Sequence, residues 1–237
     1  MVEIQKPNIL FIQADQMTAF ALGQYGNPLV KTPNIDRLAK QGVVFENAYC
    51  NNPICASSRF SMLAGRLSSK IGAYDNAAEF PASIPTFAHY LGNLGYRTCL
   101  SGKMHFVGPD QLHGFEERVT TDIYPSDFGW TPDWLAEGHQ LPPSGMSMRS
   151  VVEAGISIRS LQIDYDEEVC HQAEVKLWEY ARAADKKPFF LAASFTHPHN
   201  PFTTQPKFWD LYDHEAINIL QRCNLQTVST TRQRYSQ

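Results

Sequence analysis

Residues 189–195 read FFLAASF, a run that is apolar except for one serine. Such a short apolar run is typical of a strand that is buried on both faces of a parallel sheet. An amphipathic helical pattern precedes it over 166–183, and its apolar face comprises Val169, Ala173, Leu177 and Tyr180. A buried strand after such a helix predicts the α/β class, with a mostly parallel sheet flanked by helices.

The helix over 166–183 opens with three acidic residues, Asp166, Glu167 and Glu168. Acidic side chains in a first turn complement the positive end of the helix dipole. We therefore expect the helix to begin at this acidic cluster.

The same alternation of apolar runs and amphipathic stretches continues along the chain. We expect strands at 8–13 (NILFIQ), 43–49 and 96–101 (YRTCLS), and helices at 34–41, 57–64 and 86–94. Residues 108–150 are rich in proline, glycine and aromatic side chains, which indicates a long functional loop.

The length of 237 residues suits one large domain or two small ones, and we take one domain, 1–215, as the default. Residues 216–237 contain no Gly, Pro, Asp or Glu, and hydrophobic periodicity fades there. We interpret this end as an atypical tail, produced by truncation or by a shift of the reading frame.

The composition excludes several classes of function. A formal net charge of -4 leaves no basic stripe for nucleic acid, and no apolar run approaches the ~20 residues of a membrane span. The N-terminus lacks the layout of a signal peptide, so we expect a cytoplasmic protein. Five cysteines without a CxxC pair favour neither a disulfide framework nor structural zinc. A homo-oligomer is left open.

Ionisable side chains follow three of the expected strands. Ligands bind at the carboxyl ends of the strands of an open parallel sheet, so these side chains should meet there. Each of them alone could instead cap a turn, lie on the surface or hold a loop. The five residues are Asp15, Lys103, His105, His197 and His199.

Cys55 and Arg59 lie in NNPICASSRFSMLAGR (51–66), at the expected start of a helix. The unpaired N–H groups of a helix N-terminus favour an anion, and their field should lower the thiol pKa of Cys55. Arg59 adds a planar fork of donors for a tetrahedral anion. A buried structural cysteine is the alternative.

Together these residues resemble the formylglycine sulfatases, which have an alkaline-phosphatase-like fold, and among them most closely the choline sulfatases. The matching motifs include the Asp of PNILFIQADQ, the Cys and Arg of CASSR, the Lys and His of SGKMHF, and the second His of FTHPHNPF. The resemblance extends over roughly residues 7–215 and implies a catalytic domain truncated on its C-terminal side.

The resemblance also implies roles. A separate formylglycine-generating enzyme would oxidise Cys55 to formylglycine, whose hydrated aldehyde attacks sulfur, and Asp15 would bind Ca²⁺ together with the group derived from Cys55. Arg59 would steady the formylglycine and Lys103 would offset sulfate charge. His105 would assist the aldehyde hydrate and His199 the leaving oxygen.

YDNAAEFPAS and FGWTPDW resemble choline sulfatase in particular, where residues matching Asn76 and Trp130 line the substrate pocket. A Trp face attracts a quaternary ammonium, which agrees with choline-O-sulfate as substrate, although Trp130 could equally anchor a loop. Two departures stand out: Ser57 occupies a position where the family has Pro or Ala, and a second pair of metal ligands is missing. A phosphonate or phosphate ester hydrolase and a non-catalytic remnant are the other interpretations.

Overall fold

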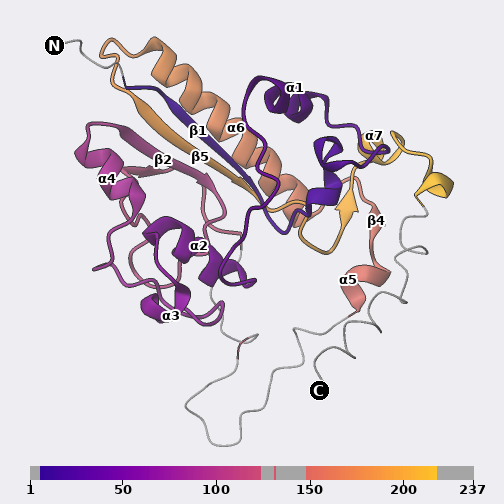
Figure 1. The fold of residues 1–237 in the computed structure, drawn as a ribbon, viewed down its shortest axis with the longest axis horizontal. Helices are drawn as coiled ribbons and strands as arrows, with labels where there is room; N and C mark the ends of the chain where they lie inside the picture. Colours follow the sequence, from indigo (N-terminus) through magenta and orange to yellow (C-terminus); the bar gives the residue numbers. More distant parts are fainter. Residues whose placement is uncertain (1–5, 124–130, 132–147, 218–237) are drawn as a thin grey trace, which may run out of the picture.

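The computed structural model describes residues 6–123, 131 and 148–217. Its main sheet contains four parallel strands in the order β1-β5-β2-β3 (Figure 1). The strands are β1 (Ile9–Ala14), β2 (Arg97–Gly102), β3 (Glu117–Arg118) and β5 (Phe189–Phe195). Strands β4 (Gly155–Ile156) and β6 (Thr203–Thr204) form a separate parallel pair. The predicted α/β class is confirmed, and FFLAASF is strand β5 from end to end.

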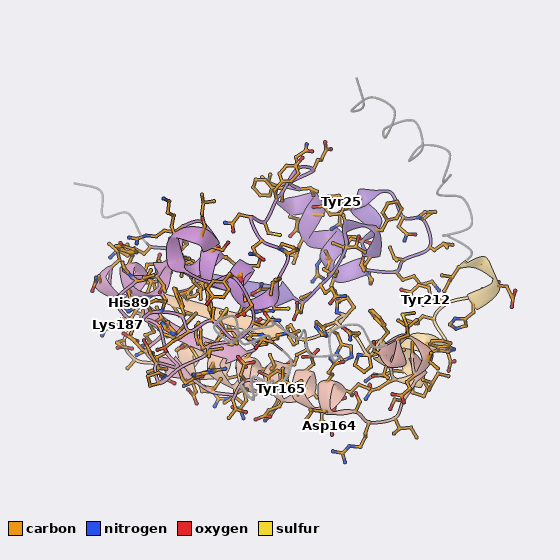
Figure 2. All side chains as sticks on the ribbon, turned by 90° about the horizontal axis from the view of Figure 1, so that it is seen from below. Tyr25, His89, Asp164, Tyr165, Lys187 and Tyr212 are labelled. Carbon is orange, nitrogen blue, oxygen red and sulfur yellow. The ribbon has the colours of Figure 1, made fainter. Side chains whose placement is uncertain are left out.

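Helices cover the two faces of the sheet, as Figure 1 shows. One face packs against α2 (Cys55–Ala64), α4 (Phe87–Asn93) and the short α3 (Ser68–Ile71). Its core includes Phe60 stacked on Phe80, with ring centroids 4.6 Å apart. The other face packs against α6 (Leu161–Arg182). Figure 2 shows Asp164 of α6 on the side of the molecule opposite to Tyr25.

The remaining elements are short and peripheral. These elements are α1 (Pro33–Gln41), α5 (Arg149–Val152), α7 (Pro206–Trp209) and the 3₁₀ turns η1 (Ala19–Ala21), η2 (Gly23–Tyr25) and η4 (His214–Ala216). No helix in the described ranges combines the length and the hydrophobicity that a bilayer crossing requires.

Two expectations about secondary structure were wrong. Residues 43–49 form no strand, and Val43 and Tyr49 are 76% and 89% exposed. Helix α6 begins at Leu161, five residues before the acidic cluster, because the Ser160 hydroxyl caps it by accepting the Ile163 N–H at 3.2 Å. The acidic cluster therefore lies beyond the first turn.

The register of the sheet places the carboxyl ends of three strands side by side. Ala14 of β1 is level with Phe195 of β5, and Gly102 of β2 is level with Ser194. Residues that directly follow these strands therefore gather at one edge of the sheet. This edge holds the site described next.

Candidate active site

A buried ion pair forms the centre of the site. The ammonium of Lys103, which directly follows β2, contacts the carboxylate of Asp15, which directly follows β1. Lys103 is fully buried and Asp15 is 7% exposed. Burial alone would raise the pKa of Asp15, but the charges of Lys103 and Arg59 outweigh burial and hold that pKa below its ordinary value. Asp15 is therefore a carboxylate at neutral pH.

Arg59 ties the ends of all three strands together from α2. Its Nη1 donates to the Lys103 carbonyl at 2.6 Å and to Ser194 Oγ at 2.9 Å, and it reaches Gln13 Oε1 at 3.3 Å. Its Nη2 lies 3.5 Å from Asp15 Oδ2. Because the guanidinium is 3% exposed and has partners on β1, on β5 and directly after β2, it fixes the position of α2 over the sheet edge.

Gly102 makes this convergence possible. Its φ of +109° lies in the region that favours glycine, and a Cβ there would lie 2.0 Å from the Ser194 carbonyl oxygen. The close approach lets the next N–H, of Lys103, donate to that same oxygen at 2.9 Å. The backbone thus delivers Lys103 to the site.

Cys55 is the first residue of α2, which begins two residues before the predicted start at 57, and it faces the ion pair. Its Sγ lies 3.9 Å from Asp15 Oδ1 and 4.0 Å from Lys103 Nζ. Burial raises the pKa of the thiol; Lys103 opposes this increase and the Asp15 carboxylate adds to it. The expectation of a lowered pKa at Cys55 was wrong, because burial is the largest effect on this thiol and raises its pKa.

Asn76 lies beside Cys55. Its Oδ1 accepts the N–H of Ala56 at 2.9 Å and so caps α2, whose Ncap residue, Ile54, has no side-chain acceptor. Trp130, the other residue expected to line a substrate pocket, lies outside the described residues. Asn76 thus supports the helix that carries Cys55.

His199 joins this group, whereas His197 does not. The ligand atoms of His199, Asp15 and Cys55 lie within 4.8 Å of one another. His199 Nδ1 lies 2.8 Å from the Asn200 carbonyl oxygen, which can only accept, so Nδ1 is the donor. His197 instead places Nδ1 2.7 Å from Asp166 Oδ2 on α6, a contact that raises its pKa. Asp166 therefore anchors the loop after β5.

His105 is buried in a left-handed backbone conformation, with φ of +62°. Burial lowers its pKa to about 4, and the Lys103 charge acts in the same direction. The imidazole is therefore neutral at physiological pH. It lies close enough to Asp15 and Arg59 for both to affect its pKa.

The sequence analysis missed Asp122. Its Oδ2 accepts the N–H groups of Met104 at 3.1 Å and His105 at 2.6 Å, and Arg118 Nη2 pairs with it at 3.0 Å. This carboxylate holds the turn after β2 in its left-handed conformation. It lies in the expected long loop without a motif around it, so no sequence pattern could have identified it.

Asp15, Cys55, Arg59 and Gln13 line a cavity of about 420 Å³. Two cationic side chains and one carboxylate contribute a formal charge of about +1 beside Cys55, which suits an anion. The described donors suit Ca²⁺ poorly, because Ca²⁺ takes about 6–8 oxygen ligands and only Asp15 offers a carboxylate here, already paired with Lys103.

The proteins that resemble this chain in sequence or fold include sulfatases and a phosphonate monoester hydrolase. A choline-sulfatase from Rhizobium meliloti is 49% identical over 88% of this chain. The matched region is 41% of the length of that choline-sulfatase. A putative sulfatase from Bacteroides thetaiotaomicron matches with a TM-score of 0.56 and 26% identity, covering 82% of this chain and 36% of that one.

A phosphonate monoester hydrolase from Agrobacterium radiobacter shares the fold, with a TM-score of 0.61 and 22% identity, covering 88% of this chain and 44% of that one. The chain thus spans less than half of each of these three relatives. The fold is the alkaline-phosphatase-like fold of the sulfatases. The sulfatase family model matches residues 7–225, and the chain belongs to the sulfatase family.

Proposed function

We propose that this chain provides the N-terminal part of a sulfuric ester hydrolase site that converts choline-O-sulfate to choline and sulfate. The observation that carries the proposal is the position of Cys55, which begins α2 within 4.0 Å of Lys103 Nζ and 3.9 Å of Asp15 Oδ1. The choice of choline-O-sulfate rests on the 49% identity to choline-sulfatase.

Lys103 and Arg59 attract the negatively charged sulfate group of the ester. Lys103 and Arg59 exceed the single carboxylate of Asp15 by one charge, so a sulfate ester anion beside Cys55 meets a positive field. Both cations are buried, and their attraction is therefore screened less than it would be at the surface. These side chains bind and orient the sulfate oxygens and stabilise negative charge as the S–O bond breaks.

The two histidines of the site, His105 and His199, are neutral, and His199 can transfer a proton. Burial lowers the pKa of His199, and its Nδ1–H is engaged by Asn200, which puts the lone pair of the neutral ring on Nε2. An anionic ester beside His199 raises its pKa again, so the ring can take a proton and deliver it to the leaving choline oxygen. Overall, water supplies a hydroxyl to sulfur and a proton to choline.

Formylglycine at position 55 would supply the oxygen nucleophile for sulfur, after modification by a separate enzyme. A divalent metal would add electrostatic stabilisation beside Asp15. We propose Ca²⁺ for this role only with further oxygen ligands from outside the described residues, since Asp15 alone cannot satisfy it.

Two measurements test the proposal on the full chain. Intact-mass analysis of the peptide that contains Cys55 should show conversion of the thiol to the aldehyde when the modifying enzyme is co-expressed. The converted chain should hydrolyse choline-O-sulfate faster than a phosphonate monoester of choline. A Lys103→Met variant should lose this turnover.

A faster reaction with the phosphonate monoester would favour the phosphonate ester hydrolase instead. A persistent thiol together with no turnover of either ester would favour a non-catalytic remnant.

A further inference from the structure

Helix α6 carries two largely buried polar side chains near its N-terminal end. Gln162 is 5% exposed, and the side chain of Asp166 is 14% exposed. The two residues are four positions apart, so they are neighbours on one face of the helix. Buried polar groups cost free energy unless they are hydrogen-bonded, so their partners show what they hold in place.

Both side chains bind the loop that follows β5 and contains His199. Asp166 accepts the N–H of Thr196 at 2.7 Å and the hydroxyl of the same residue at 2.9 Å. Gln162 Nε2 donates to the Asn200 carbonyl oxygen at 2.6 Å. Helix α6 therefore holds the loop on both sides of His199.

The Asn200 carbonyl oxygen is shared by Gln162 and His199. His199 Nδ1 donates to this oxygen at 2.8 Å, and a carbonyl oxygen has two lone pairs for two donors. The hydrogen bond from Nδ1 fixes the tautomer of the neutral ring, because it leaves the lone pair on Nε2. The position of this one carbonyl group therefore decides which ring nitrogen of His199 can take a proton.

We propose that Gln162 is a positioning residue for His199: its hydrogen bond holds the Asn200 carbonyl so that the ring keeps the Nδ1–H tautomer and presents Nε2 to the ester. This inference rests on the proposed function, in which His199 delivers a proton to the leaving choline oxygen. Without the Gln162 donor, the carbonyl group can turn toward water, and the ring loses the acceptor that selects its tautomer. Because Asp166 holds the start of the loop independently, the loss should affect the end of the loop at His199 rather than the whole loop.

NMR of the full chain with nitrogen-labelled histidine tests the inference without using turnover. At neutral pH the ring of His199 is neutral, and long-range proton–nitrogen spectra distinguish a protonated ring nitrogen from an unprotonated one. The signals of His199 are identified by their loss in His199→Gln. We expect the Nδ1–H tautomer in the wild-type chain. Gln162→Met and Gln162→Glu keep the length of the side chain but lack the donor, and each should raise the population of the Nε2–H tautomer at least threefold.

Tyr165→Phe is the matched control. Tyr165 lies on the same helix and is also buried, and its hydroxyl donates to the Thr121 carbonyl at 2.7 Å, outside the loop after β5. The control and Gln162→Met each lose one side-chain hydrogen bond to a backbone carbonyl, so they should lower the melting temperature by similar amounts. Only Gln162→Met should change the tautomer of His199.

Hydrolysis of choline-O-sulfate by the converted chain provides a second readout. Gln162→Met should lower kcat at least tenfold and leave KM within twofold, because proton delivery depends on the orientation of the ring more than binding of the ester does.

The outcomes separate this inference from the proposed function. The inference would be overturned by a wild-type tautomer in both Gln162 variants, by an equal shift in Tyr165→Phe, or by an unchanged kcat in a variant whose tautomer has shifted. A shifted tautomer without any turnover by the converted wild-type chain would overturn the proposed function and would still support Gln162 as the residue that sets the tautomer of His199.

Discussion

Replacing Gly102 by alanine should separate β2 from β5 at the edge of the sheet where the site forms. The added Cβ would lie 2.0 Å from the Ser194 carbonyl oxygen, far inside contact distance, and the nearest atoms are all backbone atoms of Ser194 on the paired strand β5. Relief of the clash weakens two hydrogen bonds at this point, from Lys103 N to Ser194 O and from Gly102 N to Thr120 Oγ1.

The expected loss follows from these contacts. A non-glycine residue at φ of +109° costs about 1–2 kcal/mol, and each weakened hydrogen bond adds about 1 kcal/mol. The free energy of unfolding should therefore fall by about 3–4 kcal/mol, a large part of the ~5–15 kcal/mol typical of a domain.

Gly95→Ala is the control for this substitution. Gly95 has a similar φ of +86°, but nothing lies within 4 Å of an added Cβ. Both substitutions change the entropy of the unfolded chain alike, so the control should cost only about 1–2 kcal/mol. Urea unfolding followed by circular dichroism measures both. A difference below about 1 kcal/mol between the two variants would refute the close approach of β2 to β5.

Four further predictions follow from the site. The pKa of His105 is about 4 in the folded chain and 6.5 in the unfolded chain, so this residue should contribute about 3 kcal/mol to the free energy of unfolding. This contribution is fully present above pH 6.5 and is lost as the pH falls toward 4. Urea unfolding across this pH range should show the loss, and His105→Gln should make the loss smaller. Asp15→Asn should cost about 3 kcal/mol or more in urea unfolding, because it leaves Lys103 buried and unpaired from this carboxylate, and adding Lys103→Met should restore part of the loss. Asp122→Ala should speed hydrogen exchange of the two amides that donate to it at least tenfold, while those inside β2 stay protected. Ser57→Ala should raise the melting temperature, equivalent to about 1 kcal/mol, because the buried Ser57 hydroxyl has no hydrogen-bond partner among the described residues.

The strands of the main sheet could be predicted where burial on both faces produces an apolar run. That signal located β5 at both ends and β2 to within one residue. Residues 43–49 carry a similar run but form no strand. A strand requires a partner, and the pattern of one segment contains no information about whether a partner exists. The hydrophobic pattern therefore identifies segments that can form a strand, and the rest of the fold determines which of these segments find a partner strand.

The start of α6 shows how tertiary contacts overrule a local rule. Asp166 looked like a first-turn acid, yet its carboxylate accepts N–H groups from Thr196 and His197 at 2.7 and 2.9 Å. Ser160, a weaker signal in the sequence, caps the helix instead. Local propensity could not reveal this exchange, because the loop after β5 lies about 30 residues away along the chain.

The candidate site was more predictable than the element boundaries. Asp15, Lys103 and His199 meet because the carboxyl ends of parallel strands share one edge, a rule that depends on topology rather than on side-chain detail. His197 follows the same strand as His199 but contacts α6, because side-chain direction within a turn is set by local packing. Topology therefore predicts the neighbourhood of a residue but not its partner.

The charges of the site also decide which ligand the described residues can hold. Asp15 is shared by Lys103 and Arg59, and their two positive charges also lower the pKa values of His105 and His199, in addition to the effect of burial. A divalent cation entering this field would be repelled by both cations and attracted by one carboxylate that is already paired. An anionic sulfate group would be attracted by both cations and repelled by one carboxylate. The described residues therefore favour an anion, whereas a divalent cation requires additional oxygen ligands from elsewhere in the domain.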